Sequence, residues 1–354
     1  MTDSAAAGTA QKAGSRVAPR YGLHLLLFVL TLVTTTVSIG MWHGLTWAAG
    51  ELAPVMETLP ESVGMFTLLW HALWSGSLSA SRFAEEIFVY GGMYSSSLMT
   101  ILLAHEMGHY VLARIHGVDV SPPYFIPGPP VVSFGTFGAF IRLREPVTDR
   151  KALMDIGAAG PLAGLVVAIP VLLVGLRLSE VGPLTPGGLY EGNSLLYMAA
   201  KWLVLGNIPA GHDVFLHPVA FAGWVGLLVT ALNLFPVGQL DGGHIAYALL
   251  GKRAAQVNRA IFGGLLGLGI ALFAFKGQAV WAVWVLIILV TGIEHPPMSD
   301  LSAPLDRPRR VMGWVCLVIF VLSFTPIPMS DEPPGGVAPP AAAVKAEAGA
   351  NPLP

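Results

Sequence analysis

Charged side chains are scarce in this sequence. Only 11% of the 354 residues are charged, whereas 54% are hydrophobic, and the mean hydropathy is +0.67. A soluble domain of this length needs many more polar side chains to cover its surface. The composition therefore excludes an ordinary soluble domain and indicates a polytopic membrane protein that resides in a lipid bilayer.

Cysteine and net charge are also nearly absent. Cys316 is the single cysteine of the chain, which excludes an internal disulfide and a metal cluster built from several cysteines. The formal net charge is −2, so the sequence lacks the strong positive charge with which proteins bind nucleic acid. We expect no nucleic-acid partner.

The two ends of the chain differ from its apolar middle. Residues 1–20 are rich in Ala, Gly and Ser, and residues 330–354 are rich in Pro, Ala and Gly. These compositions predict a flexible cytoplasmic tail at the N-terminus and a disordered tail at the C-terminus. The apolar run at 21–39 is long enough to remain as an anchor and shows no clear small-residue cleavage site. Residues 21–329 are therefore assigned to one membrane domain.

Apolar runs predict an all-α polytopic membrane protein with about six to seven transmembrane helices. One further apolar piece, at 64–74, is too short to cross a bilayer, and its Trp and His residues suit an interfacial helix. Residues 178–213 form a loop with a weak apolar piece at 195–205. The expected spans are residues 21–39, 87–115, 152–176, 214–235, 260–275, 279–293 and 311–327.

Residues 120–145 interrupt this helical pattern. Several prolines forbid a helix in the first part, and residues 131–143 mix β-branched, aromatic and glycine residues, which fits one or two strands. Because the segment directly follows the second span, one interpretation is that it lies against a site there and offers an open edge to an extended peptide. A hairpin that only plugs the helix bundle fits the pattern equally well.

The second span carries ionisable side chains where a membrane helix is normally apolar. His105 and His109 are four residues apart and so share one face of a helix, with Glu106 beside the first. This is the spacing with which a helix offers two ligands to Zn²⁺ and a base to its bound water. An ionised group inside a membrane costs about 2.5 to 3.5 kcal/mol and is normally functional. We therefore predict a metal site rather than a structural polar cluster.

An irregular stretch at 233–244 is the candidate for the other half of this site. It contains Asn233, Pro236 and the sequence Asp241-Gly242-Gly243. Irregular backbone at membrane depth is tolerated only where it is buried in protein or lines a wet cavity. A catalytic zinc needs three protein ligands, and Asp241 is the best candidate for the third. Taken alone, an Asp-Gly pair is more often a simple turn.

The distribution of positive charge predicts the orientation. With the N-terminus inside and seven crossings, most of the 19 Lys and Arg residues fall in inner segments, as expected for cytoplasmic loops. This places the end of the His-Glu helix, the strand segment and the Asp241 turn on the cytoplasmic side. We expect the protein in the inner membrane of a bacterium.

The two motifs together resemble those of the site-2 protease family of intramembrane zinc metalloproteases. The similarity covers roughly residues 87–250, from His-Glu-Met-Gly-His at 105–109 to Asn-Leu-Phe-Pro at 233–236 and Leu-Asp-Gly at 240–242. The resemblance, to a variant without an inserted PDZ domain, implies one Zn²⁺ per chain. It implies that His105, His109 and Asp241 bind the zinc and that Glu106 is the catalytic base.

The function implied is that of a metalloendopeptidase in regulated intramembrane proteolysis, cutting in or near transmembrane helices of other membrane proteins. Asn233 is expected to contact the substrate or the oxyanion, with stabilisation of the backbone around Pro236 as the alternative. The rival functions are a zinc transporter, a catalytically silent scaffold, and a membrane protease for soluble proteins. For His244 the sequence leaves two alternatives, support of the metal ligands or capping of the next helix. For His295 the alternatives are a role in gating and a position at the membrane interface.

Overall fold

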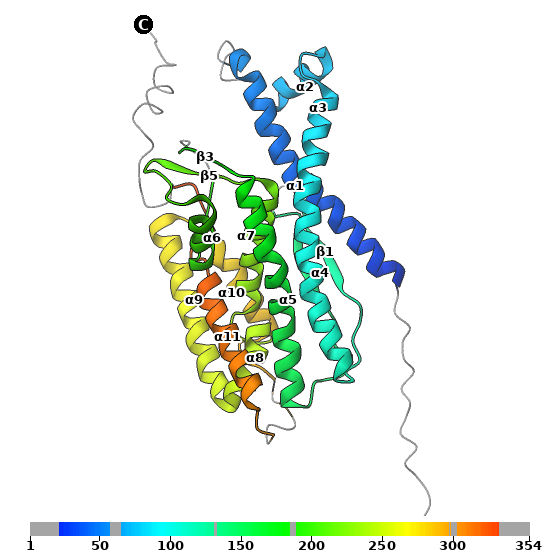
Figure 1. The fold of residues 1–354 in the computed structure, drawn as a ribbon, viewed down its shortest axis with the longest axis vertical. Helices are drawn as coiled ribbons and strands as arrows, with labels where there is room; N and C mark the ends of the chain where they lie inside the picture. The colour runs from blue at the N-terminus through cyan, green and yellow to red at the C-terminus, as the bar shows by residue number, and fades with distance from the viewer. Residues whose placement is uncertain are drawn as a thin grey trace, which may run out of the picture.

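The computed structural model describes residues 21–56, 65–130, 133–184, 189–296, 298 and 303–332. The described chain is mostly helical and forms an elongated bundle (Figure 1). The predicted tail at 1–20 and most of the predicted tail at 330–354 lie outside the described residues. Residue 330 differs from the prediction, because Met329–Ser330 form strand β6 and pair with β4 (Tyr190–Glu191).

Four helical stretches are long and apolar enough to cross a membrane. The shortest of them has 28 residues, which at 1.5 Å per residue gives about 42 Å, more than the thickness of the hydrocarbon core. The predicted six to seven crossings are not confirmed by this criterion. The four stretches are Tyr21–Leu52 within α1 (Tyr21–Met56); Ala80–Ile115, which joins α3 (Ala80–Glu85), the π-helix η1 (Glu86–Tyr90) and α4 (Gly91–Ile115); α5 (Arg150–Arg177); and Asp241–Lys276, which joins α8 (Asp241–Leu250), η2 (Gly251–Arg253) and α9 (Ala254–Lys276).

The remaining described helices are shorter, and several begin with a side chain that caps the backbone. Ser194 accepts a hydrogen bond from the amide of Tyr197, and Asp306 accepts one from the amide of Arg309, which satisfies N–H groups that have no partner within the helix. Pro218 begins α7, where its fixed φ favours helix. These helices are α2 (Met65–Ser75), α6 (Leu195–Leu205), α7 (Pro218–Asn233), α10 (Val280–Thr291) and α11 (Arg307–Ser323).

The predicted strand segment after the second span is confirmed. Strands β1 (Tyr124–Pro127) and β2 (Thr136–Phe140) form an antiparallel pair that packs against α1 and α4. Thr34 of α1 donates a hydrogen bond to the carbonyl of Gly135, and Tyr94 of α4 donates one to that of Phe134. A further antiparallel pair, β3 (Glu180–Pro183) with β5 (His212–Phe215), lies near α6 and the start of α7 (Figure 1).

Helices α4, α5 and α7 pack closely because small residues line their contacts. A Cβ atom at Gly108 of α4 would lie 2.4 Å from the carbonyl oxygen of Ala159 in α5, and one at Gly223 of α7 would lie 2.6 Å from Cα of Leu172 in α5. Glycine at such points lets membrane helices approach closely. Helix α5 continues through Pro161 and Pro170.

Candidate metal centre

Helix α4 presents His105 and His109 from consecutive turns toward α5. Both side chains are buried, and their ring centroids are 4.8 Å apart. The Nε2 atoms of the two rings are 3.1 Å from each other. The four-residue spacing therefore brings both imidazoles to one point, as the sequence predicts.

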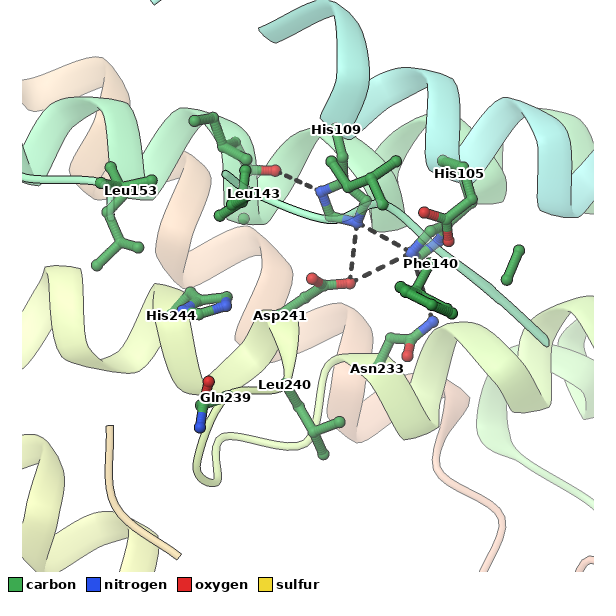
Figure 2. Close-up of a pocket in the computed structure, with 16 residues that line it drawn as sticks. His105, His109, Phe140, Leu143, Leu153, Asn233, Gln239, Leu240, Asp241 and His244 are labelled. Carbon is green, nitrogen blue, oxygen red and sulfur yellow. Dashed lines mark hydrogen bonds and ion pairs between the residues drawn. The ribbon is translucent and has the colours of Figure 1, made fainter. Parts of the chain in front are cut away.

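Asp241 joins the two histidines from the other side of the bundle. It is the first residue of α8 and follows the irregular turn after α7. Its Oδ2 atom lies 3.2 Å from Nε2 of His105 and 3.2 Å from Nε2 of His109 (Figure 2). The structure thus brings together the three predicted ligands, which come from helices far apart in the sequence.

The spacing and the protonation of these three atoms fit a zinc ion. Bonds of about 2.0 Å in a tetrahedral site separate neighbouring ligand atoms by roughly 3.3 Å, close to the observed separations. Nδ1 of His109 lies 2.7 Å from the carbonyl oxygen of Ile156, so that Nδ1 carries the hydrogen and Nε2 a lone pair. A lone pair that faces a carboxylate at this distance is stabilised by a cation between them.

Glycines of α5 provide the space in which the imidazoles lie. A Cβ atom at Gly160 would be 2.0 Å from Nε2 of His109, and one at Gly164 would be 3.2 Å from Cβ of His105. Gly157 has the same relation to His244, with 3.2 Å between the added Cβ and Cβ of the histidine. These glycines therefore permit close approach of the helices directly at the candidate metal centre.

Glu106 lies in the same cavity as the three candidate ligands. The cavity has a volume of about 210 Å³ and is lined on one side by residues 139–141, at the end of β2. Glu106 is buried, within electrostatic range of both histidines and of Asp241, and close to the backbone amide of Ile141. A carboxylate beside three potential metal ligands is the arrangement that metal-assisted hydrolysis requires.

Asn233, the last residue of α7, also lines the cavity. Its Nδ2 atom is 3.4 Å from Nε2 of His105, so its side chain faces the site. A second side chain, that of Asn258 in α9, contacts the backbone at Pro236. When the side-chain amide of the buried Asn258 is oriented with its nitrogen toward the neighbouring carbonyl groups, it donates a hydrogen bond to the carbonyl of Pro236 at 2.8 Å.

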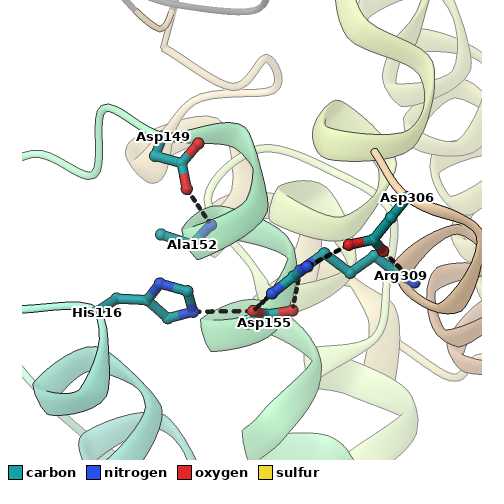
Figure 3. A network of polar contacts seen from close by, with 6 residues as sticks. All are labelled: His116, Asp149, Ala152, Asp155, Asp306 and Arg309. Carbon is teal, nitrogen blue, oxygen red and sulfur yellow. Dashed lines mark hydrogen bonds and ion pairs between the residues drawn. The ribbon is translucent and has the colours of Figure 1, made fainter. Parts of the chain in front are cut away.

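Several contributors to the site carry no signal in the sequence. The carbonyl of Ile156 orients His109, yet any residue offers a carbonyl. The neighbouring Asp155 joins three helix ends, because it contacts His116 after α4 and Arg309 of α11 (Figure 3). Only the pairing of distant segments reveals these contacts.

Comparison with known proteins identifies a family. The family model described as peptidase family M50 matches residues 93–275. The chain is 33% identical over 250 residues to the probable zinc metalloprotease EGY1, chloroplastic, of Oryza sativa subsp. japonica, covering 66% of this chain and 40% of that protein. It is 30% identical over 295 residues to the probable zinc metalloprotease EGY2, chloroplastic, of Arabidopsis thaliana, covering 79% and 51%. The chain thus spans about half or less of the length of these relatives.

These findings confirm the resemblance and correct the predicted location. The relatives are named as chloroplastic proteins, so the expectation of a bacterial inner membrane is wrong. The family match covers more than half of the chain and includes both the His105 to His109 motif and Asp241. The chain belongs to peptidase family M50, the site-2 protease family of zinc metalloproteases.

Proposed function

We propose that this protein is an intramembrane zinc endopeptidase that hydrolyses peptide bonds in or near transmembrane segments of other membrane proteins. The observation that carries the proposal is the convergence of His105, His109 and Asp241 on one point, in a cavity that also contains Glu106. The helices that carry these residues, α4 and α8, belong to stretches apolar enough to cross a membrane. The names of the relatives favour a chloroplast membrane as the location.

Each side chain of the site has a distinct role in this proposal. A zinc ion held by His105, His109 and Asp241 supplies Lewis-acid polarisation of the scissile carbonyl. The Glu106 carboxylate takes a proton from the attacking water and delivers it to the leaving amine nitrogen. The amide of Asn233 donates a hydrogen bond to the substrate carbonyl oxygen, where negative charge develops.

Strand β2 supports an extended substrate. A helical peptide has its amides hydrogen-bonded internally, so a transmembrane helix must unwind before hydrolysis. In the described part of the chain β2 pairs with β1 alone, and residues 139–141 border the cavity. The other edge of β2 is thus placed to pair with an extended segment. Phe137 and Phe140 are 65% and 47% exposed and provide apolar contacts for it.

Six or seven crossings are also part of the proposal. Beyond the four long stretches, α7 and α10 are apolar helices of 16 and 12 residues. Most of α7 is buried between its neighbours. Because protein surrounds α7, the irregular backbone after Asn233 can continue the crossing without exposing unpaired groups to lipid, which supports counting α7 as a crossing.

The test replaces Glu106 with glutamine, which keeps the shape and removes the base. We expect Glu106→Gln to retain zinc and to cleave a model transmembrane substrate in liposomes about 100- to 10,000-fold more slowly than wild type. Glu85→Gln is the matched control, because Glu85 is exposed in the same helical stretch and should leave the rate unchanged. Normal cleavage by zinc-loaded Glu106→Gln would exclude Glu106 as the base. Zinc uptake without cleavage by wild-type proteoliposomes would support the transporter.

A further inference from the structure

His244 and His295 form a hydrogen-bonded pair at the edge of the cavity. His244 lies on the first turn of α8, close to Asp241, and lines the cavity (Figure 2). Its Nδ1 atom is 2.8 Å from Nε2 of His295, which follows α10. Nδ1 of His295 is in turn 2.6 Å from the carbonyl oxygen of Pro296.

This chain of contacts determines which nitrogens carry hydrogen. Because the Pro296 carbonyl only accepts hydrogen bonds, Nδ1 of His295 must donate. Burial lowers the pKa of His295, so its ring is neutral at pH 7 and Nε2 is an acceptor. Nδ1 of His244 therefore donates to it, and Nε2 of a neutral His244 carries a lone pair.

The segment after α10 is attached firmly to α8, which keeps this arrangement in place. Tyr247 stacks on His295 with ring centroids 4.3 Å apart and an angle of 14° between the planes. The hydroxyl of Tyr247 accepts a hydrogen bond from the amide of Met298, and the amide of Gly238 donates to the carbonyl of Ile293 at 2.9 Å. The orientation of His295, and through it the tautomer of His244, is thus defined before any ligand binds.

The lone pair on His244 has no partner in the described part of the chain. The hydrogen bond of the ring is made through Nδ1, and no described group donates to Nε2. The ring lines the cavity and its Nδ1 is directed to His295, so Nε2 is the nitrogen left for a donor that enters the cavity.

An extended peptide in the cavity supplies such a donor. Its backbone presents N–H and C=O groups along both edges. The cavity is lined by residues 139–141 next to β2 and also by Asn233, Asp241 and His244. A peptide paired with β2 would turn its opposite edge toward these three side chains. Among them the amide of Asn233 is a donor suited to a carbonyl, and Nε2 of His244 is an acceptor suited to an N–H.

We propose that His244 is a substrate-binding residue whose Nε2 accepts a hydrogen bond from a backbone N–H of the extended substrate, on the edge away from β2. His295 is a positioning residue that maintains the required tautomer. The inference rests on the proposed function, because it assigns a second contact to the substrate of the same site.

The first experiment compares two substitutions that keep different nitrogens of the ring. In His244→Asn the side-chain amide replaces Nδ1 and preserves the contact with His295, but no acceptor remains at Nε2. We expect about a 2- to 10-fold loss in kcat/KM, mainly through KM, as for one neutral hydrogen bond, with zinc content unchanged. His244→Gln places an amide at the Nε2 position and should restore part of the loss.

The second experiment uses model transmembrane peptides in which one backbone amide near the cleavage site is replaced by an ester, which lacks the N–H. We expect wild type to lose kcat/KM for an ester at one position outside the scissile bond, and His244→Asn to show no further loss there. Additive losses at every position would overturn the inference. A larger loss in kcat/KM on ester replacement for His244→Asn than for wild type would also overturn the inference.

His295→Phe gives an independent measurement if His244→Asn loses zinc. Phenylalanine retains the stacking with Tyr247 and removes the acceptor that defines the tautomer, so we expect the same position-specific insensitivity to the ester. If His295→Phe loses as much kcat/KM as wild type when the ester stands at that position, the inference is overturned. If wild type itself cleaves none of the amide peptides, the proposed function fails, and that outcome is distinct from cleavage with additive losses.

Discussion

The imidazole of His109 is oriented through both of its nitrogens. Nδ1 contacts the Ile156 carbonyl, and Nε2 faces Asp241 and His105. A ligand whose second nitrogen is already hydrogen-bonded loses little freedom when it binds a metal. At the scale of single residues, Asp241 is the one proposed ligand that comes from a different segment, and its removal is the sharpest test of the candidate centre.

Asp241→Ala should therefore abolish stoichiometric zinc binding. Mutation of a residue that hydrogen-bonds to a metal ligand typically lowers metal affinity about 10- to 100-fold. We therefore expect removal of the ligand itself to lower zinc affinity at least about 100-fold. Metal analysis of the purified protein in detergent measures this. Asp119→Ala is the control, because Asp119 contacts Arg144 and Arg114 at the surface and should keep full zinc content. Full zinc content in Asp241→Ala would remove Asp241 from the ligand set.

At the scale of elements, the glycines of α5 determine how closely that helix approaches α4. Gly160 is the tightest of these positions at the metal centre, because an added Cβ would meet the Nε2 atom of His109 at 2.0 Å. No real Cβ contact is so short, and the obstacle is the imidazole of a proposed metal ligand. One methyl group therefore displaces either the ligand or the helix.

We expect Gly160→Ala to lower zinc affinity by at least about 10-fold, the effect of disturbing the surroundings of a ligand. Competition with a chelator measures the affinity. Gly267→Ala is a matched control, since it makes the same change within α9, where an added Cβ meets nothing within 4 Å. Alanine raises helix propensity, so this control should be at least as stable as wild type. Equal zinc affinity in the two variants would contradict the predicted contact.

At the scale of the whole molecule, Asp155 connects the ends of three helices. Its carboxylate accepts hydrogen bonds from Nε of Arg309 at 2.8 Å and from Nη2 at 2.6 Å, and it lies 2.8 Å from Nε2 of His116. Asp306 contacts the same guanidinium (Figure 3). The cluster thus attaches α11 to α5 and to the end of α4, one residue before the carbonyl that orients His109.

Arg309→Met should lower the unfolding temperature of the protein in detergent. The substitution leaves the largely buried Asp155 with His116 as its remaining partner. Removing one member of a buried ion pair costs about 3 to 5 kcal/mol, and partial exposure reduces this to about 1 to 3 kcal/mol. Arg310→Met is the control, because Arg310 is exposed beside it and should change little. Equal unfolding temperatures in both variants would show that the cluster contributes no stability.

Much of this architecture follows from local patterns. The composition indicates a membrane protein, and the spacing of His105 and His109 places both rings on one helix face, because helix geometry repeats every 3.6 residues. The β-branched, aromatic and glycine residues of 131–143 mark the segment that contains β2, whereas β1 lies in the proline-rich part before it, where the sequence only excluded a helix. Pro236 and the Asp-Gly-Gly sequence mark the irregular turn before α8. The number of crossings is less accessible, since α7 and α10 are shorter than a usual span.

The sequence by itself determined the apolar helices, the pair of imidazoles and the chemical types that a zinc site needs. Only the tertiary structure decided that Asp241 lies 3.2 Å from both histidines, that Gly160 makes room for His109, and that His244 lines the cavity and contacts His295. The physical reason is that helix periodicity acts over neighbouring turns. Contacts between remote helices depend on how whole surfaces pack, and packing leaves no repeating pattern along the chain.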